Sequence, residues 1–140
     1  MRHLLLLSLF GLAACAGPLP TPDPQKAWVD LYALPGYLLM ADELDGRDLR
    51  DGRFFQVAPG EHELEARFQF DVNNGGGATG DFNSGPMQIT CYLRLRYDNF
   101  VAGQRYRLEA RPLAMRAQGW LYDEQRNVLA RARVLRCGSF

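Results

Sequence analysis

The sequence predicts an all-β fold, an antiparallel β-sandwich or a partly open barrel of about seven or eight short strands. Two long segments, residues 62–72 and 89–97, alternate between apolar and polar side chains. That alternation is typical of a strand with one buried face and one face in water. Turn dipeptides such as Pro35-Gly36 and Pro59-Gly60 separate shorter apolar segments, and several short strands joined by turns favour these two architectures.

The expected strands can be placed in chain order. They cover residues 28–33, 37–44, 53–57, 62–72, 89–97, 105–111, 115–122 and 127–134. The two long segments can form a hairpin with Val72 opposite Ile89, and this register pairs Glu65 with Arg96. A slip of one residue would bring apolar side chains onto the polar face, so we expect the faces to be fixed.

The first 14 residues predict a secretory signal peptide. Met1-Arg2-His3 is basic, residues 4–12 are almost wholly apolar, and Ala13-Ala14 precedes Cys15. This order of basic, apolar and small residues is that of a cleaved export signal. The apolar run is shorter than the roughly 20 residues that a membrane-spanning helix needs.

The segment Leu12-Ala13-Ala14-Cys15 resembles the bacterial lipobox. The resemblance implies cleavage before Cys15 and attachment of fatty-acyl chains such as palmitate to that cysteine. Several chains on one residue anchor a protein stably to a membrane. Ala16, where inner-membrane retention would favour Asp, implies the outer membrane with the domain facing the periplasm.

The remaining sequence divides into a tether and one domain. Residues 15–27 hold the lipidated cysteine and prolines at every second position from Pro18 to Pro24, a pattern that favours an extended or disordered tether. Residues 28–140 are long enough for a single β-rich domain with its own core.

Two cysteines remain after the anchor is accounted for, and they predict a disulfide between Cys91 and Cys137. Cys91 lies on the apolar face of its segment. Cys137 has the opposite parity to the apolar residues of the last strand, including Val134. A bulge or an early end of regular pairing must therefore turn Cys137 inward.

The sequence offers no convincing catalytic, cofactor or metal site. His62 is the only histidine after the signal peptide, and neither Ser84 nor Ser139 lies in a nucleophile motif. His62 is interpreted as a hydrogen-bonded residue at a strand end. The acidic segment 42–52 fails the calcium-loop pattern because Ala41 and Arg47 stand where aspartates are required.

The Gly- and Asn-rich segment 73–88 is the best candidate for a binding surface. A connection of this length is uncommon unless it is functional or disordered. Phe82 and Met87 could serve as contact residues there, and plain disorder is the alternative.

The charge of the chain is balanced, with 16 basic and 16 acidic residues. The arginines are spread along the expected strands among carboxylates, which argues against one basic patch and against nucleic acid as a partner. The expected partners are the membrane, through the lipid, and a protein or wall component of the envelope.

Three stretches, with the lipobox, resemble an uncharacterised family of short pseudomonad-type outer-membrane lipoproteins. They are Trp28-Val29-Asp30-Leu31 with Leu39-Met40-Ala41-Asp42, the segment 60–70, and Cys91-Tyr92-Leu93-Arg94-Leu95-Arg96-Tyr97 with residues 102–108. The family has no assigned activity, so the resemblance implies no catalytic residue. The leading hypothesis is a non-enzymatic β-domain for binding or structural support. The alternative is a small periplasmic hydrolase acting on peptidoglycan or glycan, which would show a pocket with convergent carboxylates.

Overall fold

The computed structural model describes residues 17–73 and 85–140. Every regular element in these residues is a strand, so the all-β prediction is confirmed. The strands are β1 Ala27–Tyr32, β2 Leu38–Leu44, β3 Arg47–Asp48, β4 Phe54–Val57, β5 Gly60–Val72, β6 Met87–Phe100, β7 Arg105–Leu113, β8 Arg116–Tyr122, β9 Val128–Arg131 and β10 Arg133–Gly138. No helix in the described residues is long and apolar enough to cross a membrane.

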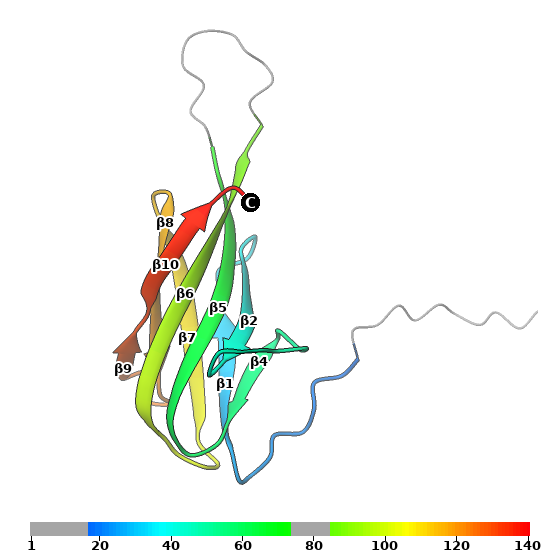
Figure 1. Cartoon of the computed structure of the whole chain (residues 1–140), viewed down its shortest axis with the longest axis vertical. Coiled ribbons are helices and arrows are strands. Elements are labelled where there is room, and N and C mark those ends of the chain that lie inside the picture. The colour runs from blue at the N-terminus through cyan, green and yellow to red at the C-terminus, as the bar shows by residue number, and fades with distance from the viewer. Residues whose placement is uncertain (1–16, 74–84) are drawn as a thin grey trace, which may run out of the picture.

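The strands form two five-stranded sheets packed face to face as a β-sandwich. One sheet has the order β4-β1-β7-β8-β9 and the other β10-β6-β5-β2-β3. Figure 1 shows β5, β6 and β10 in front of β7 and β8. All neighbours pair antiparallel except β1 and β7, which run parallel. This pair joins the N-terminal strand to the second half of the chain.

The last predicted strand is two strands in the structure. β9 belongs to one sheet and β10 to the other, and the chain changes sheets at Ala132. The Ala132 backbone N–H still donates to the Gly119 carbonyl of β8 at 2.8 Å. The prediction of one continuous strand over 127–134 is therefore wrong, because alternation cannot reveal a change of sheet that keeps the same face inward.

The long hairpin of β5 and β6 forms, but its register differs from the prediction by two residues. Val72 lies opposite Met87, and Ile89 lies opposite Phe70. Glu65 consequently pairs with Arg94 rather than with Arg96. A shift of two residues leaves each side chain on its face, because side chains in a strand repeat every two residues. The alternation of side chains could therefore predict which face of the sheet each residue lies on, but not which residue pairs with it on the neighbouring strand.

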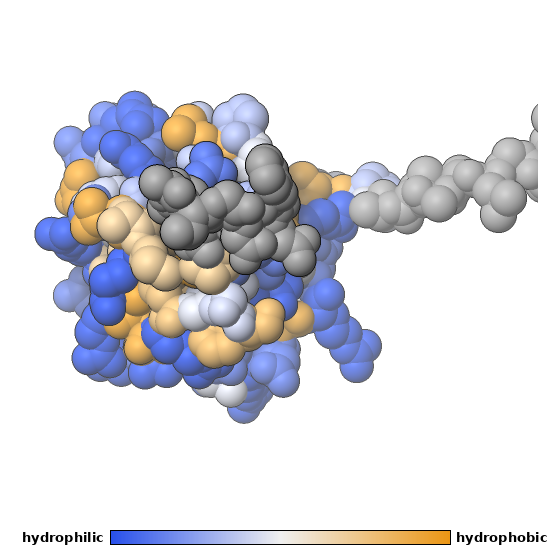
Figure 2. All heavy atoms as spheres, turned by 90° about the horizontal axis from the view of Figure 1, so that it is seen from above, coloured by the Kyte–Doolittle hydropathy of each residue, from blue (hydrophilic) through white to orange (hydrophobic). Residues whose placement is uncertain are grey.

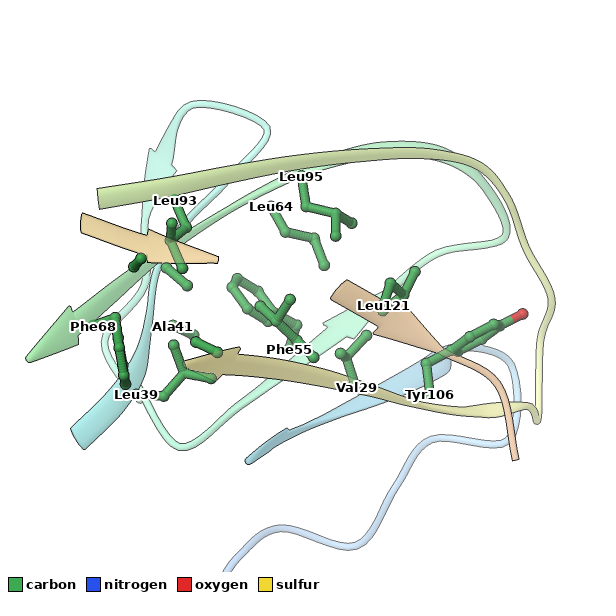
Figure 3. Packing of buried hydrophobic residues seen from close by; sticks show 14 of the residues in the cluster. Val29, Leu39, Ala41, Phe55, Leu64, Phe68, Leu93, Leu95, Tyr106 and Leu121 are labelled. Carbon is green, nitrogen blue, oxygen red and sulfur yellow. The ribbon is translucent and has the colours of Figure 1, made fainter. Parts of the chain in front are cut away.

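The core lies between the sheets and comes from every long strand (Figure 3). Phe55 of β4, Phe68 of β5 and Leu121 of β8 are fully buried within it. Inward-facing side chains from the first and second halves of the chain meet in this core. For this reason β1 and β4 pack against strands that lie far away in the sequence. The fully buried large side chains are Phe55, Phe68, Phe70, Phe100, Leu64, Ile89, Leu93, Leu95, Leu108, Leu121, Val29 and Val57.

The predicted disulfide between Cys91 and Cys137 is present. The two residues lie directly opposite each other on β6 and β10, with their Cα atoms 4.1 Å apart. The register of β10 shifts between Val134 and Arg136. This irregularity reverses the parity of the strand and turns Cys137 toward the buried side, as the sequence required.

The described part of the expected tether forms hydrogen bonds with the domain before β1 begins, one of them from the Gly103 backbone N–H to the Lys26 carbonyl at 3.0 Å. The Arg53 guanidinium donates to the Gly17 carbonyl at 2.6 Å, and the Asp23 backbone N–H donates to Gln56 Oε1 at 2.9 Å. β1 starts at Ala27, one residue before the predicted domain boundary. The end of the Pro-rich segment therefore lies against β4 and the loop before it.

Candidate functional site

The outer face of the β4-β1-β7-β8-β9 sheet is built by alternate residues of three adjacent strands. On β7, Tyr106 and Leu108 are buried in the core while Arg105, Arg107 and Arg111 are exposed. The neighbouring strands place aromatic residues beside them. Tyr32 of β1 lies next to Glu109, and Trp120 of β8 lies on its other side.

Five guanidinium groups lie over four aromatic rings on this surface. Arg107 lies 5.1 Å from the Tyr32 ring centre, and Arg111 lies 5.2 Å from that of Trp120. The other pairs are Arg105 with Trp28, Arg126 with Tyr122 and Arg131 with Trp120. We call these nine residues the arginine–aromatic face. Such stacking is attractive by about 0.5–2 kcal/mol per pair and holds each guanidinium in place.

Arg105 is bound at one end of the arginine–aromatic face by Asp30. Its Nε and one terminal nitrogen donate to the two Asp30 carboxylate oxygens at 2.6 and 2.9 Å. Trp28 Nε1 donates to the same carboxylate at 2.9 Å. The hydrogen bond from Arg105 is the largest of the effects that hold the pKa of Asp30 below its usual value of 3.8, and burial opposes it. Asp30 is therefore ionised at neutral pH.

Replacing Asp30 with asparagine should remove an acid-sensitive part of the stability. A depressed folded-state pKa contributes stability that is complete well above 3.8 and is lost as the pH falls below 3.8 toward the folded pKa. The wild type should therefore lose more of its thermal midpoint between pH 5 and pH 3 than Asp30→Asn does. Thermal unfolding followed by circular dichroism at both pH values measures this. Parallel losses in the two proteins would contradict the role of the Asp30–Arg105 pair.

The other carboxylate of the sheet surface, Glu109, lies beneath three arginines. Its side chain is only 5% exposed. Arg126 donates to Oε1 at 3.2 Å, an Arg107 nitrogen lies 3.6 Å from the same oxygen, and an Arg111 nitrogen lies 3.9 Å from Oε2. A buried carboxylate needs such partners because its desolvation is costly.

Two adjoining hollows open on this surface. The first, of about 370 Å³, is lined by both acidic and basic groups, among them Asp30, Glu124 and Arg105. The second, of about 340 Å³, is lined by Tyr32, Leu34, Arg107, Glu109, Ala110, Arg111 and Arg126. Volumes of this size lie at the lower end of the range for small-molecule sites, about 300–1,000 Å³.

The described residues that the sequence singled out lie away from the arginine–aromatic face. Cys15 and Phe82 fall outside the described residues. Met87 is the first residue of β6, where it is half-buried, pairs with Val72 and packs against the core. Figure 2 looks down on the end of the sandwich where β6 begins, and apolar residues lie there among charged ones.

His62 is hydrogen-bonded at the start of β5, as expected. Its Nδ1 lies 2.6 Å from Asp45 Oδ2. Asp45 and Gly46 both have positive φ, 51° and 77°, in the turn between β2 and β3, which is the conformation an Asp-Gly hairpin turn adopts. The Asp45 carboxylate also accepts the Glu63 backbone N–H at 2.8 Å. The histidine thus fastens this turn to β5.

The acidic segment contributes to a group of three carboxylates on the other sheet. The ligand oxygens of Asp42, Glu43 and Glu65 lie within 4.8 Å of one another. The charge of Glu65 is the main cause that raises the pKa of Glu43 above its usual value of 4.5. Arg94 neutralises Glu65 at 3.2 Å, so the group is a partly compensated acidic surface.

Sequence reasoning missed the arginine–aromatic face, although a signal was present. Residues 105–111 alternate basic and apolar side chains except at Glu109, and Trp120 and Tyr122 share one parity on the next strand. The face brings together arginines that are spread along the sequence, and Asp30 and Glu109 lie among them. Sheet pairing gathers Arg105, Arg107 and Arg111 with arginines that lie later in the chain.

Comparisons with known proteins give no further guidance on this site. No family model, no curated protein and no solved structure matches the chain.

Proposed function

We propose that this chain is a lipid-anchored envelope lipoprotein whose β-domain binds a ligand, without chemical turnover, at the periplasmic side of the outer membrane. The arginine–aromatic face is the binding surface. The observation that carries the proposal is the position of five guanidiniums over four rings of one sheet face. Contact with a ring uses the charge of a guanidinium and leaves N–H donors free for a ligand.

Two of these arginines have donors to spare. Within residues 17–73 and 85–140, Arg131 forms no ion pair, and the nearest carboxylate oxygen to Arg111 is 3.9 Å away. Both lie over Trp120, which restricts their movement before a ligand arrives. Groups that are ordered in advance lose less entropy on binding. This supports recognition of a polar or anionic ligand.

Binding explains the hollows better than hydrolysis does. A hydrolase acting on glycan needs a carboxylic acid whose pKa is raised. The pKa of Asp30 is lowered, chiefly by its hydrogen bond to Arg105, and Glu109 is surrounded by three guanidiniums. Positive charge beside Asp30 favours a carboxylate that stays ionised.

The anchor is tested by replacing Cys15 with alanine. Without the thiol no acyl chain can be attached, so the protein should leave the membrane fraction or remain unprocessed. Cell fractionation and the intact mass of the product measure both outcomes. Membrane association together with the same processed mass as the wild type would contradict the lipid anchor.

The binding surface is tested by a photo-reactive phenylalanine analogue introduced into the full chain in living cells. At Gln118, opposite Arg111 on β8, it should form a covalent adduct with the ligand. The control position is Arg96, a side chain 68% exposed on the outer face of the other sheet. Equal adduct yields at the two positions, or none at Gln118, would contradict the assignment of the surface.

A further inference from the structure

The second hollow of the arginine–aromatic face has more arginines than carboxylates in its lining. Arg107, Arg111 and Arg126 line it with Glu109 as its only carboxylate within the described residues. All three guanidiniums lie within 3.9 Å of Glu109, so the group has a formal charge of about +2 at neutral pH. The first hollow has three carboxylates in its lining, Asp30, Asp123 and Glu124, and it shares Arg107 and Arg126 with the second.

The donors in the second hollow exceed the acceptors. Each guanidinium has about five N–H donors, whereas one carboxylate offers about four acceptor positions. Arg126 makes a hydrogen bond to Glu109, while Arg107 and Arg111 approach it at 3.6 and 3.9 Å only. The two latter side chains are 44% and 56% exposed. Their remaining donors are accessible to a ligand from water.

Each of the three arginines is also held from behind by a ring. Arg107 lies over Tyr32, Arg111 over Trp120 and Arg126 over Tyr122. The rings come from β1 and β8, on both sides of the strand that carries Glu109. The sheet therefore fixes the spacing of the three guanidiniums, and the buried carboxylate fixes their direction.

We propose that a phosphate monoester binds in this hollow, between Arg107, Arg111 and Arg126. A phosphate monoester carries a charge of about −1.5 to −2 at pH 7 and three acceptor oxygens, which match the charge and the three guanidiniums. Tyr32 and Leu34, 41% and 49% exposed at the rim, provide an apolar wall for the organic part. The inference rests on the proposed binding surface and adds the chemical class of its ligand.

The test is a calorimetric titration of the full chain, purified in a non-ionic detergent, at low ionic strength. The probes are inorganic phosphate, glucose 1-phosphate and glycerol 3-phosphate, with glucose as the neutral control. Glucose 1-phosphate binding most tightly would assign the phosphate to a sugar, and glycerol 3-phosphate to a lipid headgroup. Arg111→Gln and Arg107→Gln should each weaken the best probe by about tenfold or more, since hydrogen bonds to charged groups have that magnitude.

The matched control is Arg96→Gln, which removes the same charge from the other sheet and should leave the affinity unchanged. Circular dichroism verifies that each variant is folded. Absence of binding by all three phosphates, or equal losses in Arg111→Gln and Arg96→Gln, overturns the phosphate site. If the cross-link at Gln118 nevertheless forms, the binding surface stands and only the ligand class is wrong.

Discussion

Replacing Phe55 with alanine is expected to lower the free energy of unfolding by about 3–5 kcal/mol. Phe55 lies in the short edge strand β4 and is completely buried between the two sheets (Figure 3). The variant loses the transfer free energy of the ring and leaves a cavity that a sandwich core can fill only in part. Because single domains are stable by about 5–15 kcal/mol, the loss is a large fraction of the total.

Urea denaturation followed by fluorescence measures this loss, and the adjacent residue provides the control. Phe54 points to the other side of β4 and stacks on Trp28 at a ring distance of 4.2 Å. Phe54→Ala should cost about 0.5–1.5 kcal/mol beyond its small loss of buried area. Similar midpoints for the two variants would show that β4 does not close the core as described.

Removing the disulfide should have the second large effect on stability. Cys91 and Cys137 close a loop of 46 residues, and the chain-entropy model gives roughly 3–4 kcal/mol for a loop of that size. The double variant Cys91→Ala/Cys137→Ala should unfold at a correspondingly lower urea concentration. The bond also fastens β10, the last strand and an edge strand, to its neighbour β6. Hydrogen exchange should therefore increase most in residues 133–138.

Reduction provides the control for this variant. A thiol reductant should lower the urea midpoint of the wild type toward that of the double variant and leave the double variant unchanged. Mass spectrometry after alkylation verifies the redox state. Two alkylatable thiols in unreduced wild type, or a midpoint that reduction does not move, would contradict the stabilising bond.

The sequence was sufficient to predict which side chains of each strand face the core, because side chains in a strand alternate with a period of two residues. Leu64, Phe68 and Leu93 are buried where alternation placed them. The same period cannot choose between registers that differ by two residues. Both registers pair Glu65 with an arginine, Arg96 in the prediction and Arg94 in the structure, so charge could not decide between them either.

The parallel pairing of β1 with β7 could not be predicted from local patterns. The two strands are separated by most of the domain, and nothing in residues 27–32 selects a partner. This pairing places Tyr32 beside Glu109 and Asp30 beside Arg107. The candidate site depends on this contact, which explains why the arginines looked dispersed in the sequence.

The disulfide was predictable because composition and parity together constrained it. Two cysteines in a segment that the sequence predicts to be exported favour a bond, and the parity of Cys137 required an irregularity before it. The structure has that irregularity between Val134 and Arg136. In contrast, a glutamate is expected at the protein surface, so the burial of Glu109 could not be predicted. It follows only from the three arginines that the sheet brings over its side chain.

Arginine-specific modification in intact cells is the measurement that tests the binding surface most directly. Phenylglyoxal is applied to cells and, separately, to the purified chain, and the modified arginines are quantified by mass spectrometry. A ligand on the arginine–aromatic face should protect Arg111 and Arg131 in cells but not in the purified chain, while Arg47, exposed on β3 of the other sheet, reacts equally in both. Equal reactivity of Arg111 and Arg131 in cells and in the purified chain would contradict the proposal that this face is occupied in the envelope.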